Sequence, residues 1–594
     1  MSKAHIPLER APRQEGLFAL LAHAGPSARK ALAGIAAFSG LINILALTSS
    51  LYMLQLYDRV IPSHSVPTLI GLSLIMLVLF AGYGLLDVIR AKLMARVGLE
   101  IDRTYRSGVY RLLVTLPLKA ANTSDTLQPV RDLDQVRSFV AGAGPIALFD
   151  FPWMPFYLGL VFLLHPWLGL LALAGAVILV VLTLLTDLRS RTATREATVY
   201  SAVRLAFADA SRRNAEAIVA MGMGTALAQR WSHRSEDGLV SQIRGADIAA
   251  TYGTLSKVLR YVLQSAVLGL GAYLTINGQA TGGVMIAASI LTSRALAPVE
   301  IAIANWRSFL AARASAQRLD AFFKSVPEAS DRLVLPAPTK SLSVDSLFVA
   351  GPGQSKPILQ NISFGIQAGT ALGIIGPSAS GKTTLARAIV GAWTPMRGSV
   401  RLDNATLDQW PLGTIGRHVG YLPQDIELFD GTVAQNIARF SPGATSEAVV
   451  AAAKLACVHD MIVGFSNGYE THIGEGGAVL SAGQRQRLAL ARALYGDPFL
   501  VVLDEPNSNL DADGDAALTQ AILSVRARGG ICVVIAHRPA ALTAVDQLLV
   551  LAHGQIQAVG PKDDVLRKVM QSVSPPAQVP GRFKVVTEGA PAHG

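Results

Sequence analysis

Charged residues and cysteines are both scarce in this 594-residue sequence. Asp, Glu, Lys and Arg make up 16% of it, against about 25% in ordinary soluble domains, whereas 51% of the residues are hydrophobic and the mean hydropathy is +0.39. This composition excludes a disordered or collagen-like chain. The two cysteines, Cys457 and Cys532, are too few for a disulfide scaffold and are not spaced as metal ligands, so we expect both to be buried thiols.

Negative charge is the scarcer sign. The sequence has 52 Lys and Arg residues against 41 Asp and Glu residues, which gives a net charge of +11. A basic excess fits either a nucleic acid or the anionic cytoplasmic face of a membrane as partner, and the high apolar content favours the membrane.

Charge is absent altogether from long segments, at residues 31–57, 60–86, 151–186 and 261–293. About 20 apolar residues cross a bilayer, so the two shorter segments each hold one span. Turn-forming residues near 165–167 and 277–283 divide the two longer ones into hairpins. We therefore predict six transmembrane helices, at residues 31–56, 64–87, 144–164, 167–187, 258–276 and 283–304.

Lys and Arg are concentrated in two of the connecting segments. Residues 90–144 contain nine and residues 188–257 contain ten, whereas the three short loops on the opposite side contain only Arg59. The positive-inside rule places both long loops and both chain ends in the cytoplasm. The basic excess is then explained by membrane topology, and we expect no nucleic-acid partner. Helical spacing in Leu93–Leu116 and Thr192–Met221 predicts that membrane helices continue into the cytoplasm.

The predicted organisation has five parts. An N-terminal cytoplasmic segment (1–30) precedes the transmembrane domain (31–325), and a Pro-rich linker (326–341) follows it. Short β-branched strands then alternate with helices over residues 342–571, which is typical of an α/β domain. The tail (572–594) is rich in Pro, Gly and Ala, and we expect it to be disordered.

A phosphate-binding loop of the Walker A type opens the α/β domain. A short apolar strand (372–375) runs into a Gly-rich loop and then a helix, which is the context that such a loop requires. Its glycines let backbone amides curl around phosphate oxygens, Lys382 reaches the β- and γ-phosphates, and the Thr383 hydroxyl can bind Mg²⁺. The candidate nucleotide-binding residues here are Gly376, Ser378, Ser380, Gly381, Lys382, Thr383 and Thr384.

Two later strands end in residues suited to hydrolysis. The apolar strand 499–504 ends at Asp504, which is placed to hold Mg²⁺, and the adjacent Glu505 can polarise an attacking water. His537 follows the strand 531–536 and is placed to contact the γ-phosphate. A chance Gly-rich turn would not be followed by these parts in this order, so we predict a P-loop ATPase.

Further motifs resemble those of the ATP-binding cassette (ABC) transporters. Residues 480–487 (LSAGQRQR) look like the family signature, Gln424 stands in YLPQD, and Asp511 ends a stretch similar to the D-loop. The resemblance covers residues 20–570. It implies that ATP and Mg²⁺ lie between the P-loop of one chain and the signature of a second, and hence a homodimer. The further site residues that it implies are Ser481, Gly483, Gln484 and Asp511 for the nucleotide, Thr383, Gln424 and Asp504 for Mg²⁺, and Glu505, His537 and Gln424 for catalysis.

The sequence departs from the family pattern in two places. Ala482 replaces the commoner glycine of the signature, which could slow hydrolysis. The aromatic residue on which these cassettes stack adenine is missing, because Ala350 or Gly351 stands near its place. Phe348 is close by, but we expect it to point into the core.

The arrangement of six spans ahead of one cassette resembles an ABC exporter half, a membrane α-helical domain joined to an α/β P-loop ATPase domain. Residues 281–300 and 504–511 (DEPNSNLD) resemble transporters of type I protein secretion, of the kind that secretes proteases and lipases. This resemblance implies export of a largely unfolded polypeptide with an uncleaved C-terminal signal across a bacterial inner membrane. It also implies a periplasmic membrane-fusion adaptor and an outer-membrane channel as partners. Only about 30 polar residues precede the first span, so we expect no leader-cleaving domain.

Charged residues inside spans are costly and are often functional. Arg294 and Glu300 lie in the sixth predicted span and Asp150 lies at the start of the third. Arg294 either lines a polypeptide path or pairs with one of the two carboxylates. Residues 123–131 and 212–223, at the centres of the long loops, are candidates for transmitting cassette movement to the spans.

Three other functions remain open from the residues alone. A lipid or small-molecule exporter would have the same fold, and the nature of the exported molecule would separate it from a protein exporter. An ATPase acting on DNA would lack membrane association. A receptor or channel with a degenerate cassette would lack hydrolysis, whereas Lys382, Glu505 and His537 are all present.

Overall fold

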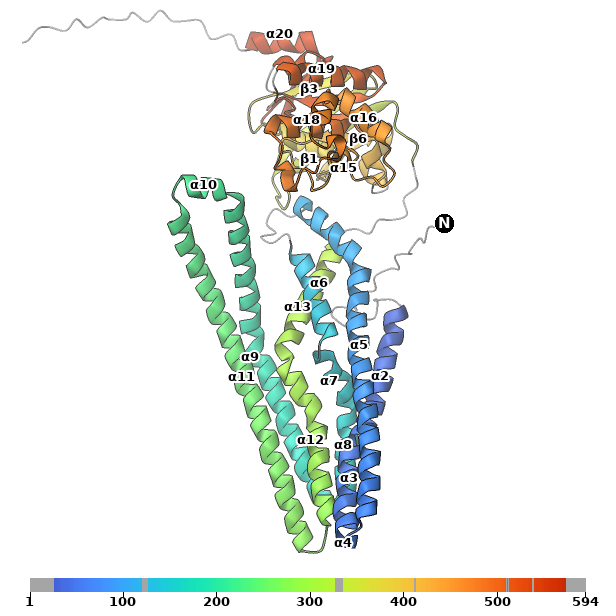
Figure 1. Cartoon of the computed structure of the whole chain (residues 1–594). Helices are drawn as coiled ribbons and strands as arrows, with labels where there is room; N and C mark the ends of the chain where they lie inside the picture. The colour runs from blue at the N-terminus through green and yellow to red at the C-terminus, as the bar shows by residue number, and fades with distance from the viewer. Residues whose placement is uncertain are drawn as a thin grey trace, which may run out of the picture. The chain divides into compact units, whose positions relative to one another are not determined.

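The computed structural model describes residues 26–119, 127–325, 335–410, 413–508, 510, 512–536 and 539–572. The chain divides into two compact units, an all-helical unit that precedes residue 328 and a mixed α/β unit that follows it (Figure 1). Each unit is described by itself.

Long helices make up the first unit. Its elements are α2 (Pro26–Ala46), α3 (Thr48–Gln55), the π-turn η1 (Leu56–Val60), α4 (Ile61–Ser63), α5 (Val66–Lys119), α6 (Gln128–Ala141), α7 (Gly144–Asp150), the 3₁₀ turn η2 (Phe151–Trp153), α8 (Met154–Leu164), α9 (Pro166–Arg213), α10 (Ala215–Ala220), α11 (Gly224–Ile276), α12 (Gly282–Ala304) and α13 (Trp306–Ser325).

Six helical segments among the described residues are long and apolar enough to cross a membrane. They are Pro26–Ser63, Val66–Lys119, Gly144–Leu164, Pro166–Ser190, Gly224–Ile276 and Gly282–Ala304. Each overlaps one predicted span, and several extend beyond it, so the prediction of six transmembrane helices is confirmed. The breaks fall at the predicted turns, where His165 caps α9 and Thr281 caps α12 with side-chain acceptors.

Three helices are far longer than a membrane is thick. Helices α5, α9 and α11 contain 54, 48 and 53 residues. At 1.5 Å per residue each is roughly 70–80 Å long, against about 30 Å for the apolar core of a bilayer. The prediction that membrane helices continue beyond the bilayer is therefore confirmed. Helices α9 and α11 lie side by side over most of their length (Figure 1).

The second unit has two sheets and helices that cover them. Its strands are β1 (Ser341–Ala350), β2 (Pro357–Gln367), β3 (Ala371–Ile375), β4 (Arg397–Leu402), β5 (Ala405–Thr406), β6 (Val419–Leu422), β7 (Leu500–Asp504), β8 (Ile531–Ile535), β9 (Gln547–Ala552) and β10 (Gln555–Pro561). Its α-helices are α14 (Lys382–Ile389), α15 (Val433–Ile437), α16 (Ser446–Leu455), α17 (His459–Val463), α18 (Ala482–Leu494), α19 (Ala512–Ala527) and α20 (Lys562–Ser572), and its 3₁₀ turns are η3 (Leu407–Gln409), η4 (Ile415–Arg417), η5 (Gly468–Glu470), η6 (Glu475–Gly477) and η7 (Pro539–Leu542).

The larger sheet positions the site. Its strand order is β10-β9-β3-β8-β7-β6, and all neighbouring pairs except β10–β9 are parallel. Every residue of β7 and β8 is buried, because α18 and α19 cover one face of the sheet and α14 with the smaller sheet covers the other. Since parallel strands end at the same edge, the segments that follow β3, β6, β7 and β8 meet there.

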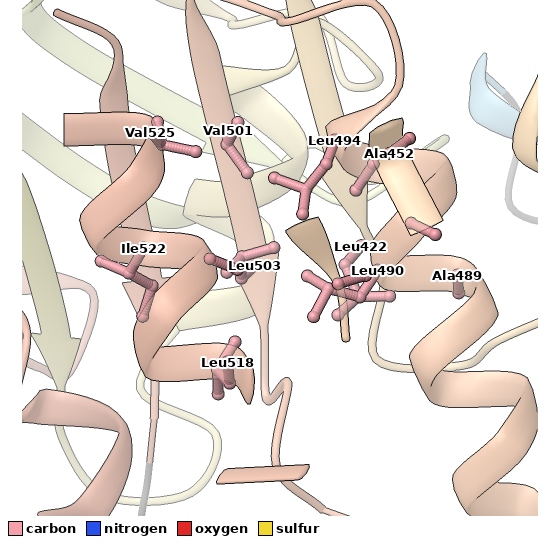
Figure 2. Close-up of a cluster of buried hydrophobic side chains, with 14 of the residues drawn as sticks. Leu422, Ala452, Ala489, Leu490, Leu494, Val501, Leu503, Leu518, Ile522 and Val525 are labelled. Atoms are coloured by element: carbon pink, nitrogen blue, oxygen red, sulfur yellow. The ribbon is translucent and has the colours of Figure 1, made fainter. Parts of the chain in front are cut away.

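Apolar side chains from α18 and α19 cover one face of this sheet. Figure 2 shows Leu490 and Leu494 of α18 near Leu422 of β6, and Ile522 of α19 near Leu503 of β7. These residues belong to one continuous buried cluster, so α18 and α19 are fixed against the strands that lead to the site.

One cysteine prediction is wrong. Cys532 is buried in β8, and burial raises its thiol pKa to about 12. Cys457 is exposed instead, because it lies beyond the end of α16 in a left-handed turn with φ of 52°.

Candidate nucleotide site

The P-loop requires glycine at two positions. Gly376 follows β3 with φ of 157°, and a Cβ there would lie 2.0 Å from the Leu551 carbonyl oxygen. Gly381 has φ of 100° at the start of α14, and a Cβ there would lie 2.7 Å from the Leu359 side chain. Side chains at either position would displace backbone or packed core, so the loop keeps its tight path past the helix N-terminus.

Lys382 is folded back into this loop. Its Nζ donates hydrogen bonds of 2.9 Å to the carbonyl oxygens of Gly376 and Pro377. Burial lowers the pKa of Lys382, while the charges of Glu505 and Asp504 oppose that shift. The loop also contains Ser380, whose buried Oγ has no hydrogen-bond partner within the described ranges, whereas Ser378 is exposed and Thr384 is buried. A loop of amides with an ammonium group and an unsatisfied hydroxyl fits a polyphosphate.

Asp504 is the unsatisfied acid of the site. Its side chain ends β7 at 1% exposure, and among the residues that the structure describes neither carboxylate oxygen has a hydrogen-bond partner. Burial raises the pKa of Asp504 to about 6, and Glu505 adds to the rise. The Thr383 hydroxyl, near Asp504 but outside good hydrogen-bond geometry, opposes it together with the cations of the site. A buried carboxylate without a partner is costly, and a cation is the group that would remove the cost.

Gln424 connects the candidate Mg²⁺ ligand Thr383 with the candidate catalytic base Glu505. Thr383 Oγ1 donates to Gln424 Oε1 at 3.5 Å, and Gln424 Nε2 donates to Glu505 Oε2 at 3.2 Å. Glu505 itself has φ of 51°, and its backbone amide donates to the Ile535 carbonyl oxygen at 2.9 Å. The hydroxyl of Thr383, the amide oxygen of Gln424 and the carboxylate of Asp504 are hard oxygen donors of the kind that Mg²⁺ prefers, so the residues fit a magnesium nucleotide.

The signature motif forms an exposed helix start. Ser481 caps α18 in a reciprocal capping box, since Gln484 N donates to Ser481 Oγ at 3.2 Å and Ser481 N donates to Gln484 Oε1 at 2.9 Å. Ser481 and Ala482 are exposed and Gly483 is half-buried. The motif therefore presents the amide end of a 13-residue helix at the surface, which is a favourable position for a phosphate.

Sequence reasoning missed Gln486, on the buried face of the same motif. Its Nε2 donates to the carbonyl oxygens of Glu505, at 3.4 Å, and Pro506, and to Ser508 Oγ at 3.4 Å. The side chain is only 1% exposed. The motif letters alone did not mark it, because its role depends on burial, and a buried amide needs polar partners.

Asp511 and His537 lie outside the described residues. Phe348 does not point into the core, so that expectation was wrong: irregular pairing in β1 leaves its neighbours Leu347 and Val349 facing the core. Ala350 ends β1 opposite Pro357, with no aromatic group of its own to offer.

The charged residues of the spans have partners that the sequence did not indicate. Asp150 accepts from Arg90 Nη1 at 2.9 and 3.1 Å, and Glu300 accepts from Arg260 Nε at 2.6 Å. Neither carboxylate pairs with Arg294, so the pairing alternative for Arg294 is wrong. Within the part of the chain that the structure describes, half-buried Arg294 forms no ion pair with a carboxylate.

The centre of the second long loop is apolar and exposed. Val219 at the end of α10 is 80% exposed, and Met221 in the following turn is 67% exposed. In the first loop only residues 127–131 of the candidate segment are described, and there Leu127 is 49% exposed.

Comparison with known proteins agrees with this geometry. The family described as ABC transporter transmembrane region matches residues 32–298, and the family described as ABC transporter matches residues 359–508. The type I secretion system ATP-binding protein PrsD of Rhizobium meliloti (strain 1021) is 52% identical over 95% of this chain and 97% of its own length. The leukotoxin translocation ATP-binding protein LktB of Mannheimia haemolytica is 28% identical over 89% of this chain and 75% of its own length.

The fold has a counterpart among solved structures. A bacterial Atm1-family ABC exporter with ATP bound aligns with a TM-score of 0.80 at 21% identity, over 93% of this chain and 99% of that one. With six membrane-spanning helices, a P-loop cassette and a relative that is 52% identical over nearly the whole length, the chain belongs to the ABC transporters of type I secretion, as a membrane-spanning exporter subunit that couples ATP hydrolysis to transport.

Proposed function

We propose that two copies of this chain form an exporter that moves an unfolded polypeptide with an uncleaved C-terminal signal across the bacterial inner membrane. The observation that carries this proposal is the likeness to PrsD over 95% of the chain, with LktB as a second relative that is named for toxin translocation. A periplasmic membrane-fusion adaptor and an outer-membrane channel complete the proposed secretion system.

Each candidate residue has a proposed task in hydrolysis. The P-loop amides and Lys382 hold the phosphates of ATP, and the oxygens of Thr383, Gln424 and Asp504 hold Mg²⁺. The metal, when bound, neutralises phosphate charge. Glu505 accepts a proton from the attacking water, and its bond from Gln424 orients the carboxylate.

The homodimer follows from the number of parts. One chain carries one P-loop and one signature, and the start of α18 is exposed. We propose that Ser481, Gly483 and Gln484 of one chain meet the nucleotide on the P-loop of the second. Asp511 and His537 have proposed roles at the dimer-facing edge and at the γ-phosphate.

The orientation is proposed from charge. Nineteen Lys and Arg residues, nine in 90–144 and ten in 188–257, favour cytoplasmic positions for both long loops, both termini and the cassette.

Transmission to the spans is assigned to the exposed apolar end of the α9–α11 pair. Exposed side chains such as Val219 and Met221 are typical of surfaces that dock against another folded body. Changing both to Ser should leave basal ATP hydrolysis within about twofold while export falls, because neither residue lies in the nucleotide site.

For the transport path we retain Arg294. It is half-buried in α12 and has no carboxylate partner among the described residues, whereas Asp150 and Glu300 pair with Arg90 and Arg260. Such a cation in a span favours contact with a polar translocating chain. If Arg294→Ala kept wild-type ATPase and wild-type export, this role would be excluded.

The substrate class is tested with purified protein in nanodiscs. ATPase rates are compared with C-terminal peptides of candidate secreted proteins, scrambled peptides, lipids and drugs, and Glu505→Gln measures the background. A response to a C-terminal peptide and to nothing else supports protein export. A response only to lipids or drugs would instead assign the chain to lipid or small-molecule export.

A further inference from the structure

The signature helix α18 ends in direct contact with strand β6. Gly420 lies in this strand, and a Cβ added to it would lie 2.0 Å from the carbonyl oxygen of Ala493, in the last turn of α18. Any side chain at position 420 would therefore push the end of the helix away from the strand. The backbones of β6 and α18 can approach this closely because position 420 is glycine.

Arg439 bonds both sides of this junction. On the helix side, Nε donates to the Arg492 carbonyl oxygen and Nη2 to that of Ala493, both at 2.9 Å. These carbonyls lie in the last turn of α18 and have no partner within the helix. On the strand side, Nη1 donates to the carbonyl oxygens of Gly416, at 2.7 Å, and Val419, at 3.1 Å.

The guanidinium of Arg439 thus has four backbone carbonyl acceptors. A planar fork of five donors matches such a set, whereas the point charge of lysine does not. The shape of the side chain, more than its charge, makes this junction.

A second contact holds the chain beyond Gln424. Arg492 of α18 donates from Nη1 to the Glu427 carbonyl oxygen at 3.0 Å. Through Arg439 and Arg492, the end of α18 is bonded to the chain on both sides of Gln424. Leu490 and Leu494 of the same helix pack in one cluster with Leu422, two residues before Gln424 (Figure 2).

Gln424 lies between these two anchors and carries the bonds to Thr383 and Glu505. Helix α18 starts at the opposite end with Ser481, about 20 Å away along 13 residues. A rigid helix that is fixed to β6 at one end would convey a displacement of its first turn to the segment of Gln424.

We propose that Arg439 is a positioning residue for ATP hydrolysis. It bonds the end of the signature helix α18 to the strand that precedes Gln424. Binding of a nucleotide at Ser481 then sets the position of Gln424 beside Glu505. This inference rests on the roles proposed above for Ser481 and Gln424. It concerns communication within one cassette, between the signature and the hydrolytic residues.

The test uses full-length protein in nanodiscs. Arg439→Lys keeps the charge and loses the fork, and Gly420→Ala disturbs the same junction from the strand side. The matched control is Arg526→Lys, because Arg526 also joins a carbonyl oxygen, that of Ala544 at 2.9 Å, and the Asp546 carboxylate, but away from α18. For each protein we measure kcat and KM for MgATP, ATP binding in EDTA, and Tm, with rates taken at a fixed interval below each Tm.

The expected result is a split between binding and turnover. Arg439→Lys and Gly420→Ala should lower kcat at least about tenfold, the size of effect typical of residues that orient a catalytic group. The affinity of both variants for ATP in EDTA should stay within about twofold of the wild type, since the P-loop is distant from the change. The control Arg526→Lys should keep kcat within about twofold of the wild type.

Two results would overturn the inference alone: an unchanged kcat in Arg439→Lys, or an equal loss of kcat in Arg526→Lys, which would mean general loosening of the cassette. A wild-type protein that does not hydrolyse MgATP would instead overturn the proposed nucleotide site, and the inference with it.

Discussion

Buried carboxylates are treated differently in the two units of this chain. In the helical unit, Asp102 faces Arg106, Asp132 faces Arg318, and Asp187 accepts a hydrogen bond from Trp306 Nε1 at 3.0 Å. In the described part of the cassette, the equally buried Asp504 has no hydrogen-bond partner on either oxygen.

The difference separates structural charge from functional charge. A buried carboxylate that is paired within its own fold is stabilised by that fold. A buried carboxylate without a partner in the protein is instead stabilised by a bound ligand. At Asp504 the neighbouring oxygen donors indicate that this ligand is Mg²⁺ with a nucleotide. Disturbing the paired acids Asp102, Asp132 and Asp187 should therefore lower stability, whereas substituting Asp504 should lower activity and not stability.

The largest effect is expected at Asp504. Asp504→Asn should lower kcat for MgATP by roughly 100- to 1,000-fold, the loss seen when a preorganised charge-stabilising group is removed. Without nucleotide, its Tm should equal or exceed that of the wild type, because an uncompensated buried carboxylate has gone. A variant that lost stability and activity together would place Asp504 with the structural acids.

Asp132 is expected to show the opposite pattern. Arg318→Met leaves the Asp132 carboxylate buried with Gln128 as its remaining side-chain partner, and should cost about 3 kcal/mol, the lower end for a broken buried pair because Arg318 is 35% exposed. Differential scanning fluorimetry in detergent measures the fall in Tm. The control is Arg103→Met, which removes an exposed pair to Glu100 and should cost less than about 0.5 kcal/mol.

The nucleotide site also has a missing contact that can be added. Ala350→Tyr offers an aromatic ring near the position where relatives of this family stack adenine. A stacking gain of about 1 kcal/mol would lower the KM for ATP about fivefold, with kcat unchanged. If the KM for ATP stayed the same while Phe348→Ala raised it, Phe348 would be the base contact instead.

The smallest effect is expected at Asp403, a partly exposed carboxylate that is satisfied by backbone. It accepts N–H bonds from Thr339, Lys340 and Ser341 at 2.8–3.0 Å. Burial raises the pKa of Asp403, but these amides and the Lys340 charge outweigh burial, so the pKa is lowered overall. Its contribution is present above the unfolded pKa of about 3.9 and is lost as pH falls through the lower folded value.

Asp403→Asn should accordingly be less stable than the wild type at neutral pH and should lose less stability on acidification below pH 4. Thermal melts across this range measure the slope. If Tm fell with pH equally steeply in both proteins, Asp403 would not contribute to the pH dependence of stability.

Local patterns predicted much of this structure. Charge-free segments gave the six spans, and the Gly-rich loop after an apolar strand gave the P-loop with Lys382 and Thr383, because both depend on residues close in sequence. Long-range partners were not predictable in this way. Arg90 and Arg260 pair with Asp150 and Glu300 across 60 and 40 residues, and Arg439 reaches carbonyls 53 and 54 residues away.

Strand irregularity limited the rest. Phe348 was misplaced because alternation along β1 is interrupted by shifts in register. Gln486 was overlooked because its role comes from burial of the helix face and not from the motif letters.

ATP-driven export of a polypeptide can be measured as transport into inside-out vesicles. The vesicles contain this chain, and the substrate is a labelled polypeptide that carries the C-terminal signal of a candidate cargo. We expect MgATP-dependent protection of the label from protease, which disappears with Glu505→Gln and with deletion of the signal. Protection that is independent of ATP, or no protection under conditions where the same vesicles transport a lipid or drug, would contradict it.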